Sequence, residues 1–186
     1  PKAMAMLKEH VGMDIARMVK ELDKLKVSMA VGETRITDSH IEQYIGLSKE
    51  YNTFELNDAV LKQDVGRAMR IAEHFAHNQK TYPITLTITI LFGLFQQLFL
   101  LNYHMWQSRK RNIPMPSDAE LMRAIRANNP FAVKELKANI GRWNGPRLFK
   151  ILGYLREYDA KSKGVDSGGL DGGELLKELL LKIFMS

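Results

Sequence analysis

The sequence of 186 residues contains no cysteine. This absence excludes a disulfide framework and any metal site built from thiolates. The start of the chain also lacks the basic and apolar pattern of a signal peptide. We therefore expect a cytoplasmic protein. We also expect sequence upstream, because the chain opens on Pro1 and residues 3–7 read as the tail of a helix.

Motifs of nucleotide-binding and catalytic sites are missing as well. The chain has no G-x-x-x-x-G-K-[ST] loop and no G-x-G-x-x-G fingerprint. Ser167 beside Gly168 lacks the G-x-S-x-G elbow that exposes a nucleophilic serine. We therefore expect a protein that is not an enzyme, with no catalytic residues and no cofactor.

Two regions could be mistaken for metal sites. His74 and His77 lie near Glu73, but zinc usually needs at least three protein ligands, and only His104 could supply another imidazole. The loop of residues 164–173 holds glycines and acids without the spacing of a calcium loop. We expect no metal at either place, only a solvent-facing or capping histidine pair and a linker loop.

Positive charge is concentrated in the later part of the chain. Residues 1–45 carry seven basic and seven acidic groups, so the net charge of +6 arises after them. Residues 107–163 hold 13 Lys and Arg against 5 Asp and Glu. Such a stretch fits an acidic partner or nucleic acid. It also fits a solvated helical face.

Apolar residues recur at helical spacing along most of the chain, and no segment alternates as a strand does. The sequence therefore predicts an all-α protein, with a small helical unit followed by a bundle of several helices. Near the N-terminus, the residues expected on one helix face are Ile15, Met18, Val19, Leu22, Leu25 and Met29.

Capping residues mark the starts of later helices. Asn52 with Glu55 and Ser117 with Glu120 have the spacing of a capping box, and Asn129 precedes a proline. A long helix is predicted from Pro83 to about Ser108. Its residues 84–101 carry no formal charge and could span a membrane by length. Their threonines and glutamines favour a buried core helix, so we expect no membrane contact.

A basic cluster, Arg109, Lys110 and Arg111, follows the apolar helix directly. It could hold phosphates electrostatically, or it could complement the dipole at the end of that helix. Trp106, Trp143 and Tyr158 could stack on bases. Each lies on or beside an apolar stripe, so we expect all three to pack in the core.

The order of several segments resembles a known family. Residues 9–15 (EHVGMDI), 21–25 (ELDKL) and 36–46 (ITDSHIEQYIG) resemble the lid region of the delta subunit of the bacterial DNA polymerase III clamp loader. Residues 54–59 (FELNDA) with Ala68 look like the start of its collar domain. The similarity continues through Gln97 and Leu98, residues 130–133 (PFAV), residues 159–164 (DAKSKG) and the leucine-rich last helix.

This resemblance implies two domains, namely the end of an AAA+-type lid in residues 1–45 and a helical collar in residues 46–186. It implies an assembly module that joins the delta subunit to subunits of the tau/gamma and delta prime types, so that the sliding clamp can be loaded on primed DNA during replication. The clamp itself would be contacted through a missing N-terminal region, and DNA only through the assembled complex. The fragment would belong to the polymerase holoenzyme without catalytic residues of its own.

The candidate subunit contacts, chosen by placement on the later collar helices, are Trp143, Arg147, Arg156 and Lys163. The alternative interpretation is a stand-alone helical protein that binds nucleic acid through residues 109–163. The two differ in the DNA affinity of the isolated chain, which should be micromolar or tighter and steeply salt-dependent only in the second case.

Overall fold

The computed structural model describes residues 2–11, 15–29, 32–45, 51–127 and 129–186. Every regular element within these ranges is a helix, which confirms the predicted all-α class. The chain forms two compact units, Pro1–Asp58 and Ala59–Ser186, which divide within helix α4 (Thr53–Lys62). The division expected between residues 45 and 46 adjoins residues 46–50, which lie outside the described ranges.

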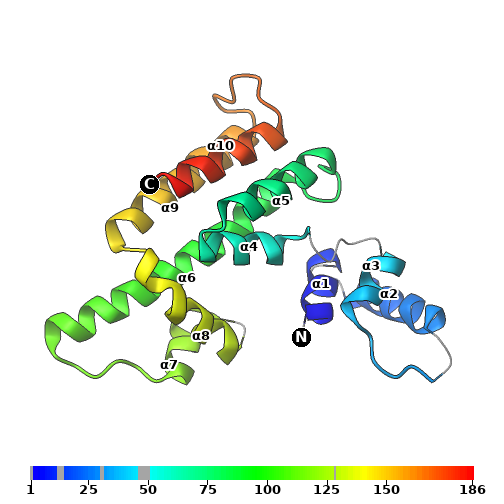
Figure 1. The fold of residues 1–186 in the computed structure, drawn as a ribbon, viewed down its shortest axis with the longest axis horizontal. Helices are drawn as coiled ribbons and strands as arrows, with labels where there is room; N and C mark the ends of the chain where they lie inside the picture. Colours follow the sequence, from blue (N-terminus) through cyan, green and yellow to red (C-terminus); the bar gives the residue numbers. More distant parts are fainter. Residues whose placement is uncertain (1, 12–14, 30–31, 46–50, 128) are drawn as a thin grey trace. The chain divides into compact units, whose positions relative to one another are not determined.

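The N-terminal unit contains three helices that contact one another, α1 (Lys2–Val11), α2 (Ile15–Ser28) and α3 (Asp38–Ile45) (Figure 1). Leu25 of α2 is fully buried. The rest of the predicted α2 stripe is not, since Ile15 is 79% exposed and Val19 is 50% exposed. The helical spacing predicted a shared face for these residues, and a unit of three helices covers only part of that face.

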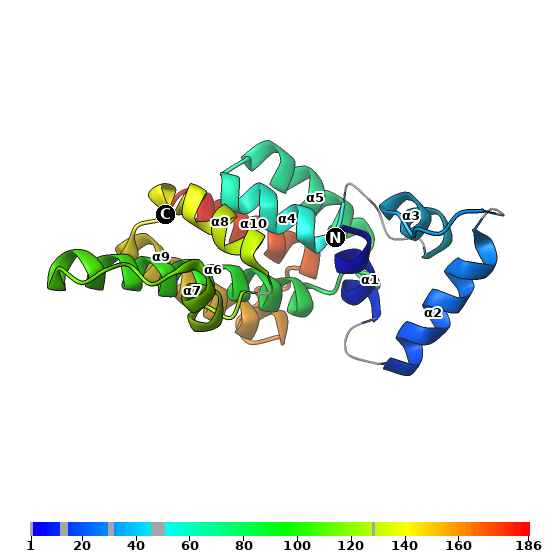
Figure 2. The same cartoon turned by 90° about the horizontal axis from the view of Figure 1, so that it is seen from below.

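The C-terminal unit is a helical bundle. Helix α6 packs along α9, and α10 packs against both α5 and α9 (Figures 1 and 2). The core between them includes Phe95 and Leu98 of α6, both fully buried. Its elements are α5 (Val65–His77), α6 (Ile84–Arg111), α7 (Asp118–Ala124), α8 (Pro130–Asn139), the 3₁₀ turn η1 (Ile140–Arg142), α9 (Gly145–Ser162) and α10 (Gly172–Phe184).

The predicted capping residues Asn52, Ser117 and Asn129 each accept a backbone hydrogen bond at the start of a helix. The side chain of Asn52 accepts a hydrogen bond from the backbone N–H of Glu55 at 3.0 Å. Ser117 and Glu120 form a reciprocal capping box, which satisfies backbone donors that a helix leaves open at its start. Asn129 caps α8 in the same way, through the backbone N–H of Ala132 at 2.8 Å.

Helix α6 is the central element of the bundle. It is long and apolar enough to span a membrane by length and composition. Leu91, Phe95 and Leu98 nevertheless lie fully buried in the bundle, as expected of a core helix. The helix runs past the predicted end at Ser108 and stops at Asn112, whose φ of 50° is left-handed and whose backbone N–H donates to the carbonyl of Ser108.

Candidate functional site

The four predicted subunit contacts separate into two pairs in the C-terminal unit. Trp143 and Arg147 lie where η1 meets the start of α9. Arg156 and Lys163 lie towards the end of α9, with Lys163 at its C-cap. The basic cluster Arg109–Arg111 ends α6. These residues therefore do not form one site.

Trp143 belongs to the core. Its side chain is fully buried, and its ring meets that of Phe95 edge to face with centroids 5.2 Å apart. The indole Nε1 donates a hydrogen bond to the carbonyl of Leu61 at 3.1 Å, which ties the end of α4 to the bundle. The expectation of core packing is confirmed for Trp143. The Trp143 side chain, 0% exposed, therefore presents no surface to solvent in this structure.

Arg147 is engaged within the chain. Its Nη2 donates to the carbonyls of Ile183 and Phe184 at 3.2 and 3.3 Å, and its Nη1 donates to the carbonyl of Arg142 at 2.9 Å. Burial lowers the pKa of this guanidinium from its usual value. Carbonyls at the end of a helix lack backbone donors, so Arg147 satisfies the C-terminus of α10.

Arg156 and Lys163 are exposed. Lys163 Nζ pairs with Asp159 Oδ2 at 2.7 Å, one helical turn away. Arg156 makes no ion pair with any residue in the described part of the chain. Of these two cations, Arg156 is therefore the freer to meet a partner.

Phe149, which lies two turns before Arg156 on α9, was not among the residues predicted from the sequence. Its side chain is 73% exposed. Residues 149, 153 and 156 share one helical face by their spacing, and Gly153 leaves open space where a side chain would stand. We call Phe149, Gly153 and Arg156 the α9 outer stripe. The signal was available, since Phe149 follows the buried Leu148 directly and so falls off the core face.

The end of α6 carries aromatic rings beside its cations. We call residues 103–111 the α6 tip. Trp106 is 50% exposed, and Lys110 Nζ lies 4.8 Å from the centroid of its ring. Tyr103 stacks against Trp106 with centroids 6.2 Å apart and planes 24° apart. The expectation that Trp106 packs in the core was wrong. The reason is that α6 outruns the helices that cover its earlier turns (Figures 1 and 2).

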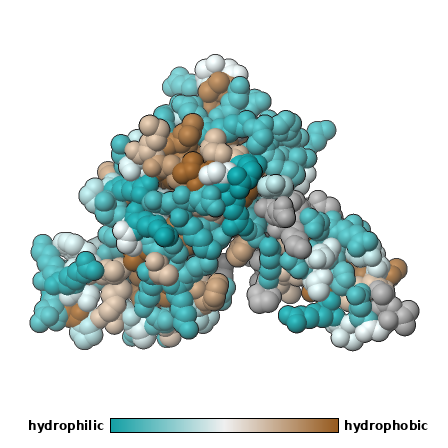
Figure 3. All heavy atoms as spheres, in the orientation of Figure 1, coloured by the Kyte–Doolittle hydropathy of each residue, from teal (hydrophilic) through white to brown (hydrophobic). Residues whose placement is uncertain are grey.

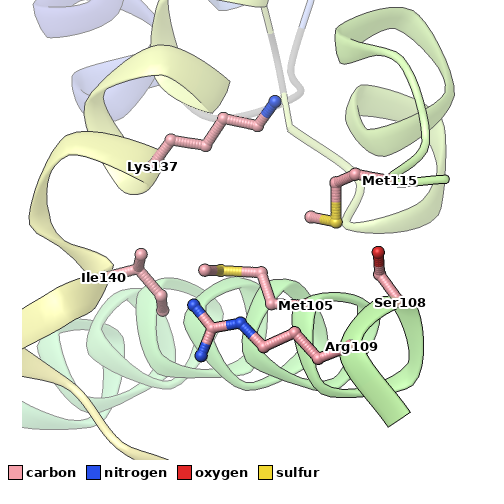
Figure 4. Close-up of a pocket in the computed structure, with 6 residues that line it drawn as sticks. All are labelled: Met105, Ser108, Arg109, Met115, Lys137 and Ile140. Atoms are coloured by element: carbon pink, nitrogen blue, oxygen red, sulfur yellow. The ribbon is translucent and has the colours of Figure 1, made fainter. Parts of the chain in front are cut away.

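A hollow of about 370 Å³ lies on another side of the α6 tip. Met105 and Arg109 of α6 face Lys137 and Ile140 across it, and Met115 covers one end (Figure 4). Lys137 is ion-paired with Asp118. The hollow combines apolar thioethers with the Arg109 guanidinium, so its chemistry suits an apolar group that carries a negative charge.

The histidine pair is held by local contacts. His77 Nδ1 lies 2.8 Å from the carbonyl of Glu73. The ring of His74 meets Tyr82 edge to face, and burial together with nearby His77 lowers the pKa of His74. No group of three potential ligands comes together among the residues that the structure describes.

The acidic residue nearest the glycine loop also has a structural role. Asp171 and Glu174 form a capping box at the start of α10, with Asp171 Oδ1 accepting from the backbone N–H of Gly173 at 2.7 Å. The Asp171 carboxylate accepts hydrogen bonds from the backbone N–H groups of Glu174 and Gly173. These bonds lower the pKa of Asp171, and the bond from Glu174 has the largest effect. This cap was not predicted, because residues 164–173 were expected to form a plain linker loop.

Of the comparisons with known proteins, the one with solved structures bears on the fold. No family model matches the sequence, and no curated protein matches it. A solved structure, the Bacillus subtilis DNA clamp loader delta protein (YqeN), matches over 100% of this chain with a TM-score of 0.64 and 18% identity. The chain spans about half of that protein, since the match covers 50% of it. The all-helical fold implied by the delta-subunit resemblance is therefore confirmed.

Proposed function

We propose that this chain is an assembly module of a replicative clamp loader. It would join a delta-type subunit to the other loader subunits, so that a sliding clamp can be opened and loaded on primed DNA. The observation that carries the proposal is the likeness in fold to a clamp loader delta protein along the whole chain. The order of the delta-like sequence segments supports it independently, because that resemblance rests on residues rather than on helix packing.

Under this proposal residues 1–45 are the end of a lid domain and residues 46–186 are a collar domain. Collar-type bundles associate through exposed helix faces, so the relevant surface is one that the bundle itself leaves uncovered. The α9 outer stripe has this character, because it combines the exposed Phe149 ring with Arg156, which makes no ion pair in the described part of the chain. Aromatic and arginine side chains are enriched at protein interfaces and carry much of their binding energy.

The proposed partners are loader subunits of the tau/gamma and delta prime types. The clamp would be contacted through the part of a delta-type subunit that this chain does not match, since the match covers 50% of the solved delta protein. The chain would contribute to the polymerase holoenzyme in the cytoplasm without a catalytic residue of its own. Lys163 remains a candidate contact at the edge of the same helix, whereas Trp143 and Arg147 would act only by holding the bundle together.

The test is size-exclusion chromatography with light scattering on this chain mixed with the loader subunits of its own organism. The proposal predicts that the chain co-elutes with them in a defined complex. Arg156→Glu should weaken that complex, and Phe149→Ala should do the same. Lys134→Glu is the matched control, because Lys134 is also an exposed cation but lies on α8. Failure of the unaltered chain to co-elute would overturn the proposal.

A stand-alone nucleic-acid-binding function through residues 109–163 is the second candidate. The excess of basic residues in that stretch favours it. Ion pairs within the chain weaken the case for nucleic-acid binding, because neighbouring carboxylates already bind three of these cations, Lys137, Lys161 and Lys163. It predicts micromolar or tighter DNA binding at physiological salt by the isolated chain, together with no co-elution.

A further inference from the structure

The aromatic pair at the α6 tip is placed for binding rather than for packing. Tyr103 and Trp106 are 45% and 50% exposed, although Trp143 shows that the same bundle can bury a tryptophan completely. The Tyr103 hydroxyl accepts a hydrogen bond from Gln107 Nε2 at 2.6 Å, which fixes the tyrosine ring on this face. Two large rings are thus held side by side with broad surfaces open to solvent.

The electrostatic setting of this pair is positive. Lys110 Nζ lies over the Trp106 ring, and Arg111 is exposed in the following position. The sequence contains no Asp or Glu from residue 84 to residue 117, so the α6 tip has no acidic group of its own. Arg109 belongs to the other side of the helix, where it lines the hollow beside Met105 (Figure 4).

The tip is also accessible. The last turns of α6 extend beyond α9 in both ribbon views (Figures 1 and 2). In the space-filling view the end of α6 shows mainly hydrophilic and neutral colours, whereas hydrophobic side chains gather over α10 (Figure 3). A flat aromatic pair set in hydrophilic, cationic surroundings differs from an apolar patch that excludes water.

We propose that Tyr103, Trp106, Lys110 and Arg111 bind single-stranded nucleic acid, with bases stacked on the rings and phosphates held by the cations. Exposed aromatic rings beside lysine and arginine are the recurring means of binding single strands without sequence preference, because every base has a π face. A duplex hides those faces between its base pairs. This activity goes beyond the assembly role and does not depend on it.

An acidic peptide is the competing ligand for a cationic tip. It would use Lys110 and Arg111 but would gain little from two exposed rings that stand together. The stacked geometry therefore favours nucleic acid. With two cations near the strand, we expect weak binding by the isolated chain, of about 10⁻⁴ M at physiological salt, so it is measured at low salt.

The experiment titrates the chain into a dye-labelled oligothymidylate of ten nucleotides and follows fluorescence anisotropy at about 50 mM salt. Trp106→Ala should weaken binding by about 5- to 100-fold, and Tyr103→Ala should act in the same direction. Lys110→Gln should reduce the slope of log K against log salt by about 0.7. Lys150→Gln is the matched control, since Lys150 is an exposed cation that also lies over an aromatic ring, that of the half-buried Tyr154, but on α9. It should leave affinity unchanged.

Intrinsic fluorescence gives a second readout on the unaltered chain. Trp106 is half-exposed and Trp143 is buried, so unlabelled oligothymidylate should quench only the exposed fraction of tryptophan emission. Thermal unfolding of Trp106→Ala should match the unaltered chain, which separates lost binding from lost folding.

Four results would overturn the proposal. They are no binding at low salt, unchanged affinity in Trp106→Ala, equal affinity for a duplex of the same length, and equal competition by a polyglutamate peptide. The assembly role is tested separately by co-elution, because the Trp106→Ala variant should still co-elute with the loader subunits. Loss of co-elution with unchanged oligonucleotide affinity would assign this face to a partner subunit instead.

Discussion

The guanidinium carbon of Arg147 lies 4.3 Å from the centre of the Trp143 ring. The pair connects three parts of the bundle, because Trp143 bonds the carbonyl of Leu61 and Arg147 bonds the carbonyls at the end of α10. A stacked arginine that donates to two carbonyls at once uses the planar geometry of its guanidinium. This pair therefore stabilises the packing of helices within the C-terminal unit.

Arg147→Lys should destabilise the chain by about 1–2 kcal/mol, because a lysine keeps the charge but loses the planar fork and the stacking. Urea unfolding followed by circular dichroism measures the effect. Arg156→Lys is the control and should change stability little, since Arg156 is exposed and makes no described ion pair. Equal unfolding midpoints for the two variants would contradict the role given to Arg147.

Trp143→Phe should destabilise by about 2–4 kcal/mol, because it removes core volume and leaves the Leu61 carbonyl without the indole donor. Trp106→Phe makes the same chemical change on the half-exposed ring of the α6 tip. It should cost less than about 0.5 kcal/mol. Thermal unfolding of the two variants under one buffer condition compares them directly, and similar losses would mean that their burial is not as described.

Gly173 lies at a close contact between α10 and α5. A Cβ at this position would meet the side chain of Ala76 and would lie 2.8 Å from its Cα. Gly173→Ala should therefore destabilise by about 1–3 kcal/mol through overpacking. Gly153→Ala on α9 meets nothing within 4 Å and should stabilise by about 0.5–1 kcal/mol. A destabilised Gly153→Ala or a neutral Gly173→Ala in urea unfolding would count against this packing.

The cap of α10 should make stability depend on acid. Backbone hydrogen bonds hold the pKa of Asp171 below the value of 3.8 that it has when unfolded. Its stabilising contribution is thus fully present above about pH 4 and is lost as pH falls through the lower, folded pKa. Asn caps helices about as well and does not titrate. Asp171→Asn should match the unaltered chain at neutral pH.

Below about pH 4 the unaltered chain should lose stability faster than Asp171→Asn, because only the carboxylate takes up a proton there. Thermal unfolding across the acid range measures the difference. Parallel curves for the two proteins would show that Asp171 adds no acid sensitivity.

Short-range signals predicted much of this fold. Asn52, Ser117 and Asn129 cap helices because each acts on a backbone N–H only three residues away. The role of Arg147 could not be predicted in this way, since its acceptors lie in the last turn of α10, far along the chain. Helical spacing placed Trp106 on a stripe, but it could not tell where the neighbouring helices would stop covering α6.

The candidate surfaces could be predicted only in part from the sequence, because they too depend on where distant helices pack. Arg156 and Phe149 could be assigned to the outside of α9 by spacing from the core residues around them. Helical geometry places Arg109 and Lys110 on different sides of α6. The positions of α8 and η1 decide which of these sides lines the hollow and which faces solvent.

Native mass spectrometry of this chain mixed with the other loader subunits of its organism tests the assembly claim most directly. We expect a single complex whose mass includes one copy of this chain, with that peak reduced for Arg156→Glu and retained for Lys134→Glu. A spectrum in which the chain occurs only free, beside a complex formed by the other subunits alone, would contradict it.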